Sequence, residues 1–372
     1  HYPVPAKDSF VVREDSESQH VRKLPKYLFV LIRILLFLFS LLAFIFSLYL
    51  MKEGARPLTP IIRNVFSVDS PASALGFGWL GANIALSGSP VAATALALLD
   101  GGALTTLESF AMIGGSRLGA AFVVLLIGVI YTVRGQKRDL SLSVGLLSLL
   151  VTQTIYPMVL LLGGWLLSNG WFHRIQVKTD QDVLSPLEKI FNPVIHMLQN
   201  SIPDWMFLPM GFLLILASLW LFDRIIPDVH LNSTSVGLAH HLLYRPIVTF
   251  LLGGLLTSIT MSVSVSLSLL VPLSVRGYIR RENVIPYILG ANITTFMDTL
   301  VAAALLDNPT AITVVIVQMI SVAIISLVLL LTVFRKYEQL LDRIVSTLGR
   351  HRRFLAAYIF IIFLIPFGLL IF

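Results

Sequence analysis

The sequence predicts an all-α polytopic membrane protein with about seven transmembrane helices and two re-entrant helical hairpins in inverted-topology repeats. Three observations lead to this prediction: little charge, long apolar windows, and two interrupted apolar segments built on one plan. Only 13% of the 372 residues are charged and 56% are hydrophobic, whereas a soluble domain carries roughly twice that charge. Several windows of about 20 residues have almost no charge, which is the length that crosses a hydrocarbon core of about 30 Å.

Composition and periodicity divide the chain into seven predicted regions. They are a cytoplasmic arm (1–27), a first transmembrane helix with a polar outer connection (28–71), a first repeat (72–168), an outer loop with a surface helix (169–204), a linking helix with an inner loop (205–245), a second repeat (246–334), and a basic amphipathic segment with the last transmembrane helix (335–372). Each repeat is predicted to contain a re-entrant hairpin and two helices, over 72–100, 103–134 and 140–168 in the first and 246–275, 284–306 and 310–334 in the second.

The hairpin prediction starts from helix-breaking residues inside apolar sequence. Residues 72–99 contain Gly76, Gly78, Gly81, Gly88 and Pro90, which weaken a helix interior. Two half-helices that meet near residues 87–90 would each be about 18 Å long, too short to span a bilayer. Such backbone breaks persist at membrane depth only where they are buried in protein or line a water-filled cavity. Residues 246–275 are interpreted in the same way.

The distribution of Lys and Arg orients these segments. With the N-terminus in the cytoplasm and each hairpin returning to its own side, the inner loops hold 19 Lys and Arg residues and the outer loops hold 6. This is the bias of the positive-inside rule. It places the C-terminus on the outer side and makes the two hairpins enter from opposite sides. The net charge of +7 therefore reflects topology, and we expect no nucleic-acid partner.

An offset of 175 residues relates the two interrupted segments. It superposes Gly78 on Gly253, Ser87 on Ser262, Ser89 on Ser264, Gly102 on Gly277 and Gly115 on Gly290. Identity is low, at nine of the 38 positions from 78 to 115. The opposite topology that the charge bias gives the two copies strengthens the interpretation. Inverted repeats with interrupted segments are an architecture of secondary transporters, whose site lies near the midplane between the repeats.

Residues 290–295, Gly-Ala-Asn-Ile-Thr-Thr, resemble a motif of the type II sodium-dependent phosphate cotransporters and their bacterial relatives. In that family each repeat has a hairpin with a Gln-Ser-Ser-Ser tip and then a helix broken at Gly-Ala-Asn-Ile-Gly-Thr-Thr. The first break is represented here by residues 115–119. The two tips, Leu-Ser-Gly-Ser at 86–89 and Met-Ser-Val-Ser at 261–264, lack the Gln and the middle Ser. The resemblance covers residues 72–134 and 246–310.

The resemblance implies Na⁺-coupled symport of phosphate or another small anion, by alternating access at a site between the hairpin tips. The residues it implies for this site are Ser87, Ser89, Ser262, Ser264, Asn292 and Thr295. Thr294, where this chain departs from the family motif, is a further candidate. Hydroxyls and amides at broken half-helices can replace the hydration shell of an anion, while free carbonyls can hold Na⁺. The alternative is that these Ser and Thr residues satisfy neighbouring backbone or let helices approach closely.

Two charged residues, Arg117 and Asp298, fall within predicted spans. An isolated charge there costs at least about 2.5 kcal/mol, so both should be paired or face water. In one interpretation Arg117 binds an anionic substrate and Asp298 a cation. In the other, the two form an ion pair that plugs the former site. Asp100 and Glu108, near the outer boundary, are expected to be solvated.

Two functions of different class remain open. One is the transporter, with a small phosphate-like anion, Na⁺ as the coupling ion and the lipid bilayer as partners. The other is a transport-inactive, transporter-like subunit or scaffold of a larger membrane complex; a homo-oligomer is compatible with either. The sequence contains no cysteine and shows no nucleophile–base pair or metal-ligand spacing, so we expect neither an enzyme nor a cofactor or structural metal.

Overall fold

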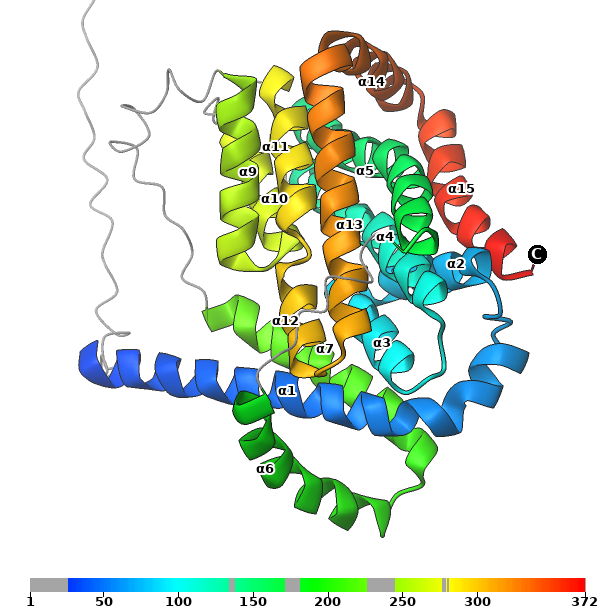
Figure 1. Cartoon of the computed structure of the whole chain (residues 1–372). Helices are drawn as coiled ribbons and strands as arrows, with labels where there is room; N and C mark the ends of the chain where they lie inside the picture. The colour runs from blue at the N-terminus through cyan, green and yellow to red at the C-terminus, as the bar shows by residue number, and fades with distance from the viewer. Residues whose placement is uncertain are drawn as a thin grey trace, which may run out of the picture.

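The structure is a computed structural model that describes residues 26–133, 138–170, 181–225, 245–275, 279 and 281–371. Within these ranges all regular secondary structure is helical (Figure 1). The helices are α1 (Lys26–Asn64), α2 (Pro71–Ala85), α3 (Ser89–Asp100), α4 (Thr106–Val133), α5 (Arg138–Ser168), α6 (Gln181–Gln199), the 3₁₀ turn η1 (Asp204–Met206), α7 (Phe207–Ile225), α9 (Pro246–Thr260), α10 (Val263–Val275), α11 (Arg281–Thr294), α12 (Met297–Leu305), α13 (Pro309–Val328), the π-helical turn η3 (Leu329–Val333), α14 (Phe334–Arg350) and α15 (Arg352–Ile371).

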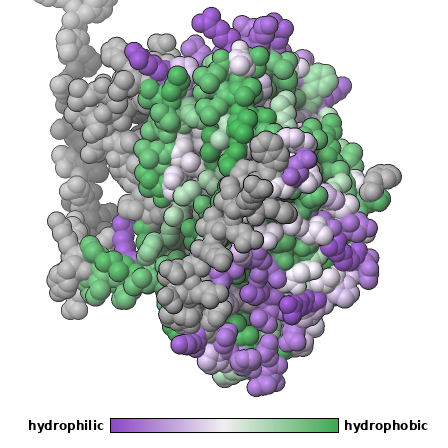
Figure 2. Space-filling model, in the orientation of Figure 1, coloured by the Kyte–Doolittle hydropathy of each residue, from purple (hydrophilic) through white to green (hydrophobic). Residues whose placement is uncertain are grey.

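Seven segments of the described chain are long and apolar enough to cross a membrane. The predicted class, an all-α polytopic membrane protein, is therefore confirmed. Figure 2 shows hydrophobic residues over α9, α11 and α13 and hydrophilic residues at the end where α14 lies. On α9 the exposed apolar side chains recur every four residues, at Ile247, Leu251, Leu255 and Ile259. This spacing places them on one helix face, where lipid can cover them.

The first helix is longer than predicted. Residues 51–64, expected as part of a polar connection, continue α1 to Asn64 even though Pro57 and Pro60 lie inside this stretch. Proline removes a backbone hydrogen bond from a helix, but four apolar residues here are buried: Met51, Ala55, Leu58 and Ile62. Tertiary packing therefore maintains the helix where local sequence disfavours it.

The pair α1–α7 forms one part of the architecture. The two helices lie side by side along the lower part of the molecule, and α9, α11 and α13 stand at a steep angle to them (Figure 1). The hydroxyl of Ser218 on α7 donates to the carbonyl oxygen of Ser40 on α1 across 2.7 Å. The amphipathic helix α6 lies against α1, where the ring of Phe191 is 5.3 Å from that of Phe46.

The offset of 175 residues also relates the helices of the two repeats. Helices α2 and α9 start and end at positions 175 apart, and so do the starts of α4 and α11. Both α2 and α9 end at a residue in the left-handed region, Leu86 with φ 50° and Met261 with φ 49°. The internal repetition is therefore a property of the backbone, although few side chains are shared.

The same glycines hold the corresponding helices together in both repeats. A Cβ at Gly78 would overlap the carbonyl of Met112, and one at Gly253 would overlap the carbonyl of Tyr287, 175 positions later. Glycine permits this close approach because it has no side chain. Helix α2 therefore packs on α4 as α9 packs on α11.

The two repeats differ in the helix that follows each pair of short helices: α4 is continuous, whereas its counterpart is divided into α11 and α12. Helix α11 ends at Thr294 and the chain resumes as α12 at Met297, next to the motif that predicted a break. In the first repeat the break predicted at residues 115–119 is wrong, because α4 is continuous from Thr106 to Val133. Gly115 and Gly119 lie instead against the carbonyls of Leu75 and Trp79 on α2. They serve helix packing and not chain reversal.

Candidate functional site

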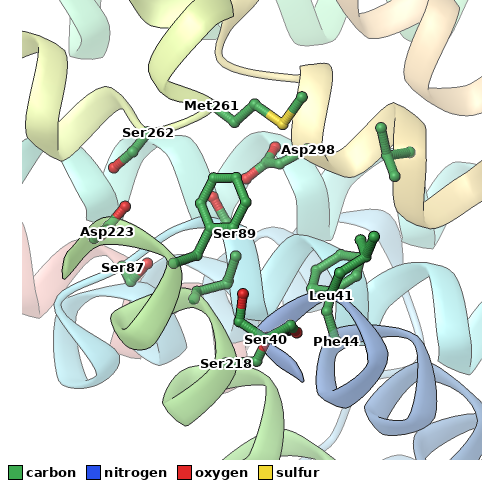
Figure 3. Close-up of a pocket in the computed structure, with 13 residues that line it drawn as sticks. Ser40, Leu41, Phe44, Ser87, Ser89, Ser218, Asp223, Met261, Ser262 and Asp298 are labelled. Carbon is green, nitrogen blue, oxygen red and sulfur yellow. Dashed lines mark hydrogen bonds between the residues drawn. The ribbon is translucent and has the colours of Figure 1, made fainter. Parts of the chain in front are cut away.

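A cavity lies where the α2–α3 turn and the α9–α10 turn meet α12 and the α1–α7 pair (Figure 3). Its volume of about 80 Å³ is several times the roughly 10–15 Å³ that one water requires. The polar side chains that line it are two carboxylates, Asp223 and Asp298, and five serines, Ser40, Ser87, Ser89, Ser218 and Ser262. The two turns that the 175-residue offset equates thus contribute to one cavity.

The turns present their serines through helix ends. Ser87 and Ser89 flank Gly88, between the left-handed end of α2 and the first turn of α3. Ser262 precedes α10, and its hydroxyl oxygen accepts from the backbone N–H of Val265 across 3.3 Å. That interaction leaves the Ser262 hydroxyl hydrogen free to donate, since a hydroxyl both donates and accepts.

Asp298 lies in the first turn of α12 and is 5% exposed. Its Oδ1 accepts from the backbone N–H of Thr299 at 2.6 Å and from the Thr299 hydroxyl at 3.0 Å. The other oxygen, Oδ2, is buried without a hydrogen-bond partner among the described residues. Asp298 is also one of the residues that line the cavity, so a buried carboxylate oxygen without a protein partner belongs to this site.

Arg117 reaches Asp298 from α4. Its Nη2 lies 3.6 Å from Asp298 Oδ1 and donates to the Thr299 hydroxyl at 2.6 Å, while Nη1 donates to the Thr295 hydroxyl at 3.1 Å. The guanidinium carbon is 4.6 Å from the ring centre of Phe296. Arg117 is absent from the described cavity lining. The geometry therefore contains the ion pair of one interpretation together with the cavity-facing Asp298 of the other.

Three further candidate residues lie away from the cavity lining. Asn292 Nδ2 donates to the hydroxyl of Thr152 on α5 at 3.4 Å, and the Thr294 hydroxyl donates to the carbonyl of Gly254 on α9 at 2.7 Å. Thr295 accepts from Arg117. For Ser264 the side chain lies outside the described part of the structure. These contacts join helices, the alternative role considered for the polar residues of this motif.

Asp223, Ser40 and Ser218 line the cavity but were not predicted. The sequence predicts that Asp223, beside Arg224, lies in the inner loop that follows the linking helix. In the structure α7 continues to Ile225 and Asp223 faces the cavity (Figure 3). The one sequence feature that could have indicated this is that Asp223 directly continues an apolar helical stretch.

A cluster of hydroxyls beside the second turn satisfies itself. The hydroxyl of Thr257 donates to Ser266 Oγ at 2.6 Å, and Ser266 Oγ lies 2.9 Å from the hydroxyl of Tyr287. All three residues are buried. At the equivalent positions of the first repeat the residues are apolar: Ala82, Val91 and Met112. This cluster therefore has a packing role between α9, α10 and α11.

The expectation that Asp100 and Glu108 are solvated is wrong for Glu108, which is 4% exposed. Arg63 donates to Glu108 through its two terminal guanidinium nitrogens, from Nη1 to Oε1 at 2.7 Å and from Nη2 to Oε2 at 2.8 Å. Asp100 pairs with Lys52 at 2.8 Å. These ion pairs link the C-terminal half of α1 to α3 and α4. They form because α1 continues to Asn64, which brings Lys52 and Arg63 within reach of the two carboxylates.

Among the described residues no three or more His, Cys, Asp or Glu side chains gather into a group that could hold a metal ion. Comparisons with protein-family models, curated proteins and solved structures found no match to this chain. Its function must therefore be argued from the cavity and the helices around it.

Proposed function

We propose that this chain is a secondary transporter that carries phosphate or another small anion together with Na⁺ through the cavity between the two turns. The observation that carries the proposal is that corresponding turns of two repeats line one cavity with Asp298. Interrupted helices within a membrane are tolerated where they line a cavity, and transporters built from inverted repeats bind their solutes at such interruptions. Alternating access would follow from movement of the repeats around this point.

Helix lengths support the proposal that the pairs α2–α3 and α9–α10 are re-entrant hairpins. They contain 15 and 12 residues in the first pair and 15 and 13 in the second, so each helix is about 18–23 Å long. A bilayer core is about 30 Å thick. In the proposed topology each pair returns to its own side, the N-terminus is cytoplasmic and the C-terminus lies outside, as the Lys and Arg bias favours.

The cavity has features suited to both solutes. Helix α3 begins at Ser89 and α10 begins at Val263, so the N-terminal ends of two helices lie at the cavity, where free N–H groups and the helix dipole favour an anion. Asp223 and Asp298 favour a cation. An anion and a cation that enter together would meet both preferences, which is the electrostatic basis for symport.

Uptake into proteoliposomes tests this proposal. We expect purified protein to accumulate radiolabelled phosphate when an inward Na⁺ gradient is imposed, and to accumulate less without it. Ser87→Ala and Ser262→Ala should lower the rate, whereas Ser168→Ala, at the exposed end of α5, should leave it unchanged. If neither phosphate nor another small anion accumulates under either condition, the transporter proposal fails.

One observation favours the second function, a transport-inactive subunit or scaffold. The buried contacts of Arg117 with Asp298, Thr295 and Thr299 tie α4 of the first repeat to the break of the second, and alternating access could require this connection to change. A scaffold should copurify stoichiometrically with another membrane protein and show no uptake. Uptake by the chain alone would exclude this alternative.

A further inference from the structure

We propose that Asp223 and Asp298 together bind one alkali-metal cation, which joins α7 to α12 across the cavity. The inference deepens the proposed function, because it assigns ligands and a mechanical role to the coupling cation. It rests on the proposed function only in treating the cavity as the solute site. Cation binding itself needs no transport and can be measured separately.

Asp298 has a buried carboxylate oxygen that a cation could contact. It is 5% exposed and lines the cavity, and Oδ2 has no hydrogen-bond partner among the described residues. A buried charged oxygen without a partner is costly. Arg117 forms an ion pair with Asp298, but its nearest nitrogen lies 3.6 Å from Oδ1, so Oδ2 still has no hydrogen-bond donor among the described residues. A cation in the cavity would satisfy the remaining oxygen.

Asp223 is the second carboxylate in the cavity lining. It approaches the same cavity from α7 (Figure 3) and is exposed, whereas Asp298 is buried. Both carboxylates line the one cavity, where their like charges repel each other. The described lining contains no Lys, Arg or His, and the guanidinium of neighbouring Arg224 lies over the ring of Trp220 at 4.0 Å. A cation between the acids would relieve the repulsion.

Charge balance selects a monovalent ion. Asp223, Asp298 and Arg117 sum to one negative charge when all are ionised, so one monovalent cation makes the group neutral. A divalent ion would leave an excess positive charge in a buried region. The other available ligands are serine hydroxyl oxygens, which suit hard cations, and among the described residues the lining offers no Cys or His for a transition metal.

The position of the two acids gives the cation a mechanical role. Asp298 belongs to α12, at the break of the second repeat, whereas Asp223 belongs to the α1–α7 pair. An ion that contacts both would hold these two parts together, and its departure would restore repulsion between the acids. Cation occupancy would thereby favour one arrangement of the repeats relative to α1–α7.

Thermal unfolding of the purified full chain in detergent tests the site. The midpoint should rise and saturate with NaCl, relative to choline chloride at equal ionic strength, because a ligand that binds only the folded state stabilises it. We expect Asp223→Asn to weaken the apparent Na⁺ affinity at least 10-fold. The matched control is Asp307→Asn, in the exposed turn after α12, where φ is 51° and Asn is well tolerated; it should keep the wild-type response.

A double variant tests Asp298 without leaving a buried charge that would prevent folding. Asp298→Asn alone leaves Arg117 buried without its acid, so Arg117→Met combined with Asp298→Asn keeps the pair neutral and should also lose the Na⁺ response. The inference is overturned if Asp223→Asn responds like wild type, if choline stabilises as well as Na⁺, or if protons alone reproduce the effect. Na⁺-specific stabilisation without anion uptake would support the site while the transport proposal fails.

Discussion

The guanidinium of Arg117 and the carboxylate of Asp298 form a buried ion pair, 3.6 Å apart, with each side chain 5% exposed. The pair joins α4, a continuous helix, to α12, which begins just after the break in the equivalent helix of the second repeat. Removing one partner from such a pair leaves an uncompensated buried charge, whereas removing both does not. The pair is therefore a connection between the repeats whose strength can be measured.

Arg117→Met and Asp298→Asn should each lower the free energy of unfolding by about 3–5 kcal/mol. The combination Arg117→Met with Asp298→Leu should cost much less than the sum, because no charge is stranded. Reversible unfolding in mixed micelles gives these values. The charge swap Arg117→Asp with Asp298→Arg should retain the fold if the pair is purely structural, and should abolish uptake if Asp298 serves the cavity.

The exposed pair Arg281–Asp342, at 3.2 Å with side chains 45% and 42% exposed, is the control. Arg281→Ala should cost no more than about 1 kcal/mol, because solvent screens surface pairs. Equal losses at the buried and exposed pairs would contradict the assignment of Arg117–Asp298 as a buried connection.

Gly253→Ala and Gly290→Ala should destabilise the second repeat. A Cβ at Gly253 would overlap the carbonyl of Tyr287, and one at Gly290 the carbonyl of Phe250, so α9 and α11 would have to separate. Overpacking of this kind costs about 1–3 kcal/mol. Chemical unfolding of each variant measures the loss.

Gly164→Ala is the matched control for these substitutions. Gly164 lies within α5 and has open space around the added Cβ, so alanine there should be neutral or stabilise by up to about 1 kcal/mol. Destabilisation at Gly164 equal to that at Gly253 would show that the close approach is not the cause.

Local patterns in the sequence sufficed for much of the fold. Glycine, proline and the repeated serines located the interruptions near Ser87 and Ser262, because half-helices end where these residues cluster. Long apolar windows likewise located the spans. The first repeat's break was wrong because Gly115 and Gly119 serve interhelical packing, and a glycine permits a break and a close approach equally well. Sequence alone does not distinguish these two roles.

The cavity could be predicted only in part, because half of its wall comes from outside the repeats. Asp298 and three lining serines, Ser87, Ser89 and Ser262, belong to the repeats that the sequence predicted. Asp223, Ser40 and Ser218 come from α7 and α1. Their presence depends on how the α1–α7 pair sits under the repeats, which is a tertiary property. The extension of α1 through Pro57 and Pro60 has the same origin, since burial overrides local preference.

The buried hydroxyls of Thr257, Ser266 and Tyr287 should behave as a unit. Tyr287→Phe removes the partner that lies 2.9 Å from Ser266 Oγ, and buried polar groups that lose a partner cost about 1–3 kcal/mol. Replacing all three by their first-repeat equivalents, in Thr257→Ala with Ser266→Val and Tyr287→Met, should cost less than the sum of the three single changes. Unfolding free energies for the singles and the triple variant test this coupling; strict additivity would contradict it.

Arg63→Lys should destabilise the contact between α1 and α4 although the charge is kept. Arg63 donates to both oxygens of Glu108 and also to the carbonyls of Val68 and Ala103, at 2.9 Å each. Lysine cannot reproduce a planar bidentate contact that serves several acceptors, so we expect a loss of about 2–3 kcal/mol, the scale of hydrogen bonds to charged groups. Lys52→Met breaks a single 2.8 Å contact between a Lys52 side chain that is 37% exposed and an Asp100 side chain that is 11% exposed. Asp100 keeps its hydrogen bond from Asn308, so this change should cost less, about 1 kcal/mol. Unfolding in mixed micelles measures both, and a Lys52 loss equal to the Arg63 loss would show that bidentate geometry is not what fastens the end of α1.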